Sequence, residues 1–208
     1  GDQLFDAPSI VLLGDAVFNA RGGAITFTGP VVADGTGRSL TIDAGANGSA
    51  SLMEVGGGLE DLSITAGQID LAGDLTLLNS ILLQAVNTDL SGDRVFSADG
   101  ITLNSNIDSE GDDAASLTLE NASTTVINGL FGGMSPLASF TSSDAGTTTL
   151  TGGVITDGRA LFRNDLLVAG DAVVQSLGDA REDGLRFLGA IDGASAGAGS
   201  LSLIVDRT

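Results

Sequence analysis

Apolar and polar residues alternate over short stretches along the whole chain, and turn-forming residues separate these stretches. Between residues 51 and 90 the apolar residues come in pairs, with glycine, alanine, aspartate, asparagine or serine between the pairs. The pairs are Leu52/Val55, Leu62/Ile64, Ile69/Leu71, Leu75/Leu77 and Ile81/Leu83. This spacing is typical of short strands with one buried face. No window of a dozen residues sustains the spacing of an amphipathic helix, so the sequence predicts an all-β protein.

A longer repeat is superimposed on this alternation. The phrase Gly-Asp-x-Val occurs at residues 14–17, 92–95 and 170–173, so the two steps between occurrences are equal in length. Two apolar–polar–apolar triplets follow each phrase in the same order. The triplets are Ile25-Thr26-Phe27 and Leu40-Thr41-Ile42, Ile101-Thr102-Leu103 and Leu117-Thr118-Leu119, and Leu185-Arg186-Phe187 and Leu201-Ser202-Leu203. The sequence therefore predicts a single segment over residues 1–208 with three copies of one 78-residue unit, at 14–91, 92–169 and, in part, 170–208.

The copies agree within the triplets and differ in length between them. The interval from the repeated valine to the next triplet is shortest in the second copy and longest in the third. It runs from Val17 to Ile25, from Val95 to Ile101 and from Val173 to Leu185. Solenoids tolerate insertions in this way, because stacked strands form the core and the turns face water.

Two architectures could carry such a repeat. Tandem β-sandwiches are the alternative, but the triplets are short for sandwich strands and the chain has no Trp or Tyr. We therefore predict a parallel β-helix of about ten coils, at roughly 20 residues per coil and about four coils per copy.

Composition limits the possible partners. Hydrophobic residues make up 42% of the 208 residues, which is enough for a core despite 31 Gly, so we do not expect disorder. The 27 acidic residues outnumber the 8 basic ones, and the net charge is −19. A surface of this charge repels phosphates and anionic lipids, so we expect no nucleic acid partner and no membrane insertion.

Two features bear on the origin of the chain, namely the lack of cysteine and the identity of the first residues. Without Cys the chain has no disulfide framework and no thiol chemistry, which fits bacterial extracellular proteins. Gly1-Asp2-Gln3 lacks the basic region and apolar stretch of a signal peptide. We therefore expect an internal or mature piece of a larger protein.

One stretch resembles a known type of repeat. Gly132-Gly133-Met134-Ser135-Pro136-Leu137-Ala138-Ser139-Phe140 is followed by the Thr-rich segment 145–153, and residues 24–45 and 185–206 look like a companion unit. A degenerate form of the first phrase stands at residues 57–62. These motifs resemble the repeat region of large Gram-negative surface adhesins of the filamentous-haemagglutinin type. The resemblance implies a right-handed parallel β-helix, export to the bacterial cell surface, and an adhesive or stalk role without catalytic residues.

An alternating polar run is the sharpest candidate site. Its members are Asn104, Asn106, Asp108, Glu110 and Asp112, with Gly111 and Asp113 beside them. Oxygen-bearing side chains at every second position of an extended segment could bind a hard cation such as calcium. Counted from Asn106, Gly111 falls where a calcium loop needs glycine, but Leu117 stands where a bidentate Glu is required. We expect a solvated acidic turn and keep calcium as the alternative, and we assign no cofactor and no metal ligand.

The aspartate of the repeated phrase has a simpler explanation than metal binding. Asp15, Asp93 and Asp171 would lie about four coils apart, or roughly 19 Å, which is too far to share an ion. An aspartate after glycine is expected to form a turn in which its carboxylate accepts backbone hydrogen bonds.

Two pairs of acidic neighbours could imitate the carboxylates of a glycosidase. They are Glu60/Asp61 and Glu182/Asp183. Glycosidase chemistry needs two carboxyl groups on either side of one bond. Neighbours on a strand point to opposite faces, and neighbours in a turn face water, so we expect neither pair to be catalytic.

Some β-helices cleave polysaccharides, but this chain lacks the residues that such enzymes usually use. Lyase chemistry needs a cationic side chain near the abstracted proton, and the arginines are scattered in a chain without Lys, His or Tyr. We therefore expect no enzyme and assign no catalytic residue.

Ice-binding solenoids need a threonine pair on nearly every coil, and only residues 147–149 and 26–28 hint at one. We therefore do not expect an ice-binding surface.

The sequence thus predicts a structural role. We expect a rigid stalk in a bacterial extracellular surface adhesin or fibre, whose parent protein binds glycans or proteins of a host surface, a neighbouring cell or a matrix. A filament subunit that stacks end to end is the first alternative, because no polar cap is evident at either end. A β-helix that binds or cleaves polysaccharides is the second.

Overall fold

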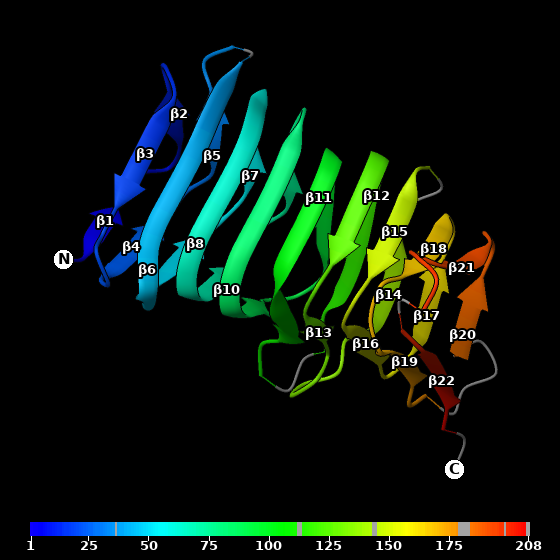
Figure 1. Ribbon diagram of the computed structural model, residues 1–208. Coiled ribbons are helices and arrows are strands. Elements are labelled where there is room, and N and C mark those ends of the chain that lie inside the picture. The colour runs from blue at the N-terminus through cyan, green and yellow to red at the C-terminus, as the bar shows by residue number, and fades with distance from the viewer. Residues whose placement is uncertain (36, 112–113, 143–144, 179–183, 198, 207–208) are drawn as a thin grey trace.

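The computed structural model describes residues 1–35, 37–111, 114–142, 145–178, 184–197 and 199–206, and these residues form strands and turns without a helix. The strands belong to one continuous sheet and lie in a row from one end of the molecule to the other (Figure 1). Every registered pair of strands is parallel, for example β1 with β4 and β19 with β22. Tandem sandwiches would need separate antiparallel sheets. The predicted all-β solenoid of parallel strands is therefore confirmed.

The strands stack in three ladders, here called A, B and C, which the chain visits in this order in each coil. Ladder A contains β1 (Gln3–Phe5), β4 (Ala24–Phe27), the ends of β6 (Arg38–Leu52), β8 (Leu59–Leu71), β10 (Ser80–Leu90) and β11 (Arg94–Ser109), then β13 (Leu130–Phe131), β16 (Gly153–Thr156), β19 (Ala172–Ser176) and β22 (Leu201–Val205). Ladder B contains β2 (Ile10–Leu12), β5 (Val31–Ala33), β7 (Val55–Gly56), β9 (Leu75–Thr76), the starts of β11 and β12 (Ser116–Ile127), β14 (Ser139–Ser142), β17 (Arg159–Phe162) and β20 (Gly184–Phe187). Ladder C contains β3 (Ala16–Asn19), the starts of β6, β8 and β10, the middle of β11, the end of β12, β15 (Thr147–Leu150), β18 (Asp165–Val168) and β21 (Ile191–Gly193).

Ladder C runs without a break from the first coil to the last. One inward column of it contains Phe18, Ile42, Ile64, Leu83, Leu103, Ile127, Leu150, Val168 and Gly193. These nine positions are separated by eight steps, so the described solenoid makes about eight turns. The expected count of about ten coils is not confirmed, because many coils are longer than that count assumed. On ladder A, for example, Ile69 pairs with Thr88, whereas Val174 pairs with the much more distant Leu203.

The long repeat of the sequence does not stack on itself. Asp15 precedes β3 on ladder C, Asp93 precedes β11 on ladder B, and Asp171 precedes β19 on ladder A. Each step from one copy to the next therefore covers three full turns and two of the three sides, rather than four turns. The predicted triplets are strands, but each triplet moves to another side of the solenoid from one copy to the next.

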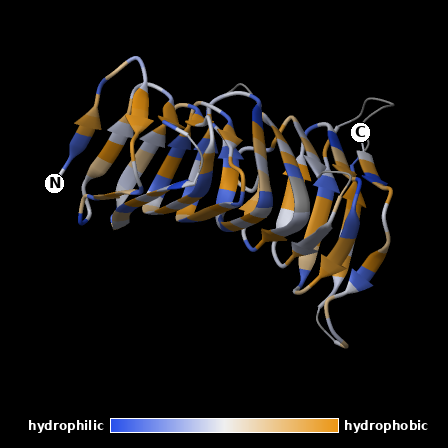
Figure 2. Ribbon diagram, turned by 90° about the horizontal axis from the view of Figure 1, so that it is seen from above, coloured by the Kyte–Doolittle hydropathy of each residue, from blue (hydrophilic) through white to orange (hydrophobic). Residues whose placement is uncertain are grey.

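A single apolar core runs along the inside of the solenoid. Alternate side chains of each strand point inward, as the period of two predicts, and Leu62 and Ile64 of β8 are both buried. Figure 2 shows the resulting alternation of apolar and polar residues along the strands. Four phenylalanine rings form a row in the second half, Phe131, Phe140, Phe162 and Phe187, with centroids 5.1 to 6.2 Å apart. Each fully buried Leu or Ile contributes about 1.5–3 kcal/mol, so this repeated burial holds the coils together.

Candidate functional site

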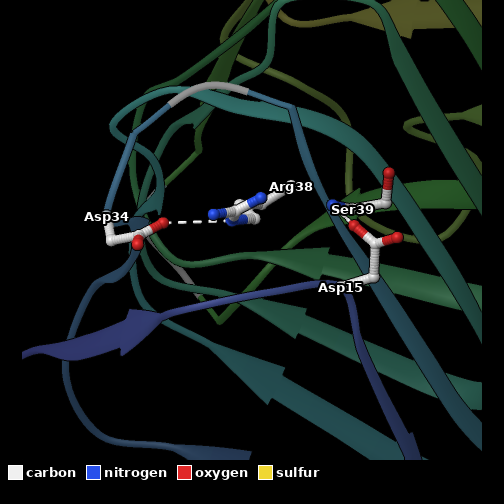
Figure 3. Close-up of polar contacts among 4 residues, drawn as sticks. All are labelled: Asp15, Asp34, Arg38 and Ser39. Atoms are coloured by element: carbon white, nitrogen blue, oxygen red, sulfur yellow. Dashed lines mark hydrogen bonds and ion pairs between the residues drawn. The ribbon is translucent and has the colours of Figure 1, made fainter.

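The repeated Gly-Asp phrase marks a hydrogen bond between coils. Asp15 Oδ1 accepts a hydrogen bond from the backbone N–H of Ser39 at 3.0 Å (Figure 3). The same contact recurs as Asp93 with Ser116 at 2.8 Å and Asp171 with Ser200 at 3.1 Å. In each pair the serine lies at or just before the start of the next strand in the same ladder. The predicted acceptor role of these aspartates is confirmed, but the donor lies in the following coil and not in the same turn.

Other side-chain oxygens make the same contact at other strand starts. The pairs are Asp2 with Ala24 at 2.9 Å, Asp74 with Val95 at 2.9 Å, Asn106 with Leu130 at 3.0 Å, and Asp165 with Ala190 at 2.8 Å. In each of these pairs the oxygen belongs to one coil and the N–H to the next coil. A side-chain oxygen that replaces water at a backbone N–H stabilises the strand start, so these side chains link successive coils.

An ion pair lies in the turn that precedes β6. Arg38 Nε lies 3.0 Å from Asp34 Oδ1, and Figure 3 shows it beside the Asp15–Ser39 contact. Both side chains are about one-third exposed, at 32% and 35%. A pair this accessible to water contributes about 0–1 kcal/mol, so it adds little to the rigidity of the turn.

The alternating polar run lies mainly in a strand and not in a turn. Asn104, Asn106 and Asp108 belong to β11, which corrects the expectation of a solvated acidic turn. Asp108 is only 4% exposed, and its Oδ1 accepts hydrogen bonds from the backbone N–H groups of Met134 and Ser135 at 2.9 and 3.2 Å. The extended segment belonged only to the calcium alternative, which the alternation of polar residues had suggested. Its function in the structure is to bond to the following coil.

Three aspartates form a column on the outward-facing side of ladder A. Asp70, Asp89 and Asp108 occupy the same position in three successive coils, and we call them the carboxylate column. Neighbouring strands are about 4.8 Å apart, so like charges lie close together. Burial raises the pKa of Asp89, and the charges of Asp70, Asp108 and Glu110 raise it further, while a hydrogen bond from Gln68 lowers it. The equal spacing of the three aspartates in the sequence is the signal that could have identified this column.

An open hollow of about 390 Å³ lies beside the carboxylate column. Its lining includes Asn87, Asp89, Asp108 and Glu110. Among the residues that the structure describes, no three acidic side chains converge as metal ligands. The calcium alternative therefore gains no support from Asn104 to Glu110, and Asp112 and Asp113 lie outside the described residues.

Asp61, one member of the first acidic pair, also bonds between coils. Ser80 Oγ donates a hydrogen bond to Asp61 Oδ1 at 2.5 Å, and Ser39 Oγ donates to Asp61 Oδ2 at 3.3 Å. Both carboxylate oxygens are thus engaged by hydroxyls of the coils on either side. Glu60 is exposed, and the second acidic pair, residues 182–183, lies outside the described residues.

A buried polar cluster inside the solenoid was not predicted from the sequence. Ser142 Oγ and Thr148 Oγ1 both donate hydrogen bonds to Asn164 Oδ1, at 2.8 and 3.1 Å. Thr125, one coil before Thr148 on ladder C, is buried with no partner for its Oγ1. Because Thr148 faces inward, residues 147–149 do not form a flat outer threonine array. The period of two could have found Thr148, since it precedes the buried Leu150 by two positions.

Comparison of the chain with protein-family models, curated proteins and solved structures gives no match. The similarity to filamentous-haemagglutinin repeats therefore stays a prediction from the sequence. In the part of the chain that the structure describes, no helix is long and apolar enough to span a membrane. The polar groups described above bond mainly between successive coils.

Proposed function

We propose that this chain is a non-enzymatic stalk in a bacterial extracellular surface adhesin or fibre. The stalk holds a binding region of the parent protein away from the cell. The parent protein, through that region, contacts glycans or proteins of a host surface, a neighbouring cell or a matrix.

The continuity of core and ladders along the rod supports this proposal. Every side of every described coil continues the ladders of the coil before it, and one hydrophobic core extends from the first coil to the last. Eight steps of about 4.8 Å give a rod of about 40 Å from this segment alone. A rod without a break in its core transmits force and resists bending.

The side-chain chemistry supports a mechanical role as well. Asp15, Asp61 and Asp108 use their carboxylate oxygens to bond with neighbouring coils. The resemblance of residues 132–153 to filamentous-haemagglutinin repeats is the reason for placing the parent protein at a bacterial surface.

A distance measurement tests the stalk. The chain has no cysteine, so spin labels can be attached to Glu54→Cys and Arg186→Cys alone. These exposed positions lie six steps apart in one column of ladder B, which corresponds to about 30 Å between attachment points. We expect a narrow distance distribution near this value, allowing for the reach of the labels, by pulsed electron paramagnetic resonance. The same labelled chain in guanidinium provides the broad control, and a broad distribution without denaturant would refute the rigid stalk.

A filament subunit that stacks end to end stays the first alternative predicted from the sequence.

A further inference from the structure

The outward side of ladder C forms a regular surface along the rod. The strands of this ladder lie side by side in one row (Figure 1). Leu40 and Ile42 of β6 are buried, so the residues that alternate with them point outward. In the coils from β6 to β15 these outward residues form three columns, which start at Ser39, Thr41 and Asp43. We call the three columns together the ladder C face.

The central column of the ladder C face contains no charged residue. All of its side chains are partly exposed, so they are available for contact. On ladder A, by contrast, the carboxylate column occupies the outward-facing side. Depletion of charge is what distinguishes the centre of a protein interface from the rest of the surface. The central column consists of Thr41, Ser63, Leu82, Thr102, Val126 and Thr149.

The two flanking columns hold two carboxylates in these described coils, and both already accept hydrogen bonds. Asp61 accepts them from hydroxyls of the coils on either side. Asp43 accepts one from the side-chain amide of Asn19 at 2.8 Å. The remaining flanking residues are Ser, Thr, Asn, Gln or Gly. The face can therefore be covered without removing an unpaired charge from water.

The ladder C face is complementary to itself about a two-fold axis that runs along the rod. This axis places the central column against the central column of a second copy, and the first column against the third. Asp61 then faces Thr65 of the second copy, and Asp43 faces Ser39 of the second copy. Each carboxylate therefore meets a hydroxyl. In the central column, Leu82 and Val126 each meet the same apolar residue of the second copy.

The opposite orientation is less favourable. A two-fold axis along the strands, centred on the same coils, would reverse one rod relative to the other. Asp15 of one copy would then face Asp165 of the other, because both extend the first column at its two ends. Both side chains are exposed, and like charges that face each other across an interface are costly. The charges thus favour rods that point in the same direction.

The size of the face is sufficient for a weak dimer. The coils are about 4.8 Å apart and the residues of a strand about 3.3 Å apart, so the face measures about 29 by 17 Å. Two such faces bury roughly 1,000 Å² in all, which is the lower limit for a specific interface. Association of this segment is therefore expected at high protein concentration.

We propose that two copies of this chain pair side by side through the ladder C face, with their rods parallel. The same surface of each copy is used, so the contact closes as a dimer. The pairing goes beyond the stalk proposal, and neither depends on the other.

The charge of the whole chain gives the pairing a salt dependence. Each copy has a net charge of −19, so two copies repel each other at low ionic strength. At 0.15 M salt the Debye length is about 8 Å, which screens most of this repulsion. The dimer is therefore more stable at physiological salt than at low salt.

A single charged substitution in the central column tests the surface. Thr102→Glu places a carboxylate where it meets its own copy across the axis. Thr118→Glu is the matched control, since Thr118 is a partly exposed strand residue on ladder B. We expect sedimentation velocity to show a concentration-dependent dimer of the wild-type chain and of the control. Thr102→Glu should associate at least about tenfold more weakly, and circular dichroism melts verify that both variants are folded.

A mixing experiment tests the orientation of the two rods. Thr102→Glu and Thr102→Arg should each dimerise weakly alone, whereas their equal mixture should recover at least about tenfold in affinity, because Glu then faces Arg across the axis. In reversed rods residue 102 would face Leu82 of the other copy, so the mixture would recover nothing. A mixture of Thr118→Glu with Thr118→Arg controls for the change in net charge.

Three results would overturn the proposal. They are a wild-type chain that stays monomeric at every concentration and salt level, a control that weakens the dimer as much as Thr102→Glu, and a Thr102 mixture that binds no more tightly than either variant alone. A broad label distance in a chain that still dimerises would refute the stalk and leave the pairing standing. A narrow distance in a chain that stays monomeric would do the reverse.

Discussion

At the residue scale, two aspartates differ in the side chains that lie above and below them in the stack. On ladder C, Asp61 lies between Ser39 and Ser80, whose hydroxyls donate to its two oxygens. In the carboxylate column of ladder A, Asp89 has an aspartate on each side. The hydroxyls supply the donors that Asp61 needs, whereas burial and the neighbouring charges at Asp89 oppose its ionisation and raise its pKa.

Asp89→Asn should stabilise the protein near neutral pH. A raised pKa in the folded state means that the contribution of Asp89 to stability is present below its unfolded pKa and is lost as the pH rises through the folded pKa. The asparagine removes this loss, so the variant should melt at a higher temperature than wild type at pH 7. At about pH 3, where the aspartate is protonated in both states, the difference should disappear.

Asp99→Asn is the matched control, because it removes the same charge from an exposed position of the same strand. Thermal melts of both variants across this pH range separate a local effect from a change in net charge. Equal stabilisation by Asp99→Asn would contradict the role of the carboxylate column.

At the scale of strands and turns, the close approach of successive coils restricts certain positions to glycine. A Cβ atom at Gly129 would lie 1.9 Å from the carbonyl oxygen of Ser105, and one at Gly152 would lie 2.0 Å from the carbonyl oxygen of Gly129. These glycines occupy the turn from ladder C to ladder A in successive coils. The stack itself, and not an unusual backbone conformation, excludes side chains here.

Gly129→Ala should therefore destabilise the protein by about 1–3 kcal/mol or more, because backbone must move to admit the methyl group. Urea unfolding measures the change in free energy. Gly35→Ala is the control, since a Cβ there has no heavy atom within 4 Å, and it should change stability by no more than about 0.5 kcal/mol. Equal costs at the two sites would show that coil contact is not the reason.

At the scale of the whole molecule, each coil contacts only the coils beside it. In such a one-dimensional stack the end coils have one neighbour instead of two, so they open most easily. We expect amide hydrogen exchange, measured by mass spectrometry at low protein concentration, to be slowest in β8 and β10. It should be fastest in β1 to β3 and in β20 to β22. Uniform exchange along the chain would indicate a single cooperative unit instead.

The sequence predicted much of the fold because burial alternates with a local period. The triplet Leu40-Thr41-Ile42 lies in β6, and Leu201-Ser202-Leu203 lies in β22, with the expected strand structure. The absence of any helical stripe also led to the right fold class. The acceptor role of Asp15 was predictable as well, because aspartate after glycine is a common turn residue.

Other features depend on the number of residues in each coil. Turn lengths vary, so the sequence alone could not place Asp15, Asp93 and Asp171 on three different sides. For the same reason it did not reveal that Asp93 bonds to Ser116 in the following coil. The polar cluster around Asn164 was missed because hydrophobicity marks serine and threonine as outward.

By itself, the sequence determined which apolar residues face inward and that the strands are short, since both follow from the local alternation of side chains, and its long repeat favoured a β-solenoid over tandem sandwiches. Only the tertiary structure decided which residues stack on one another. It brought Asp70, Asp89 and Asp108 into one column and placed Thr41 in line with Thr149. The physical reason is that stacking depends on the summed length of every turn, whereas the alternation depends on neighbouring residues alone.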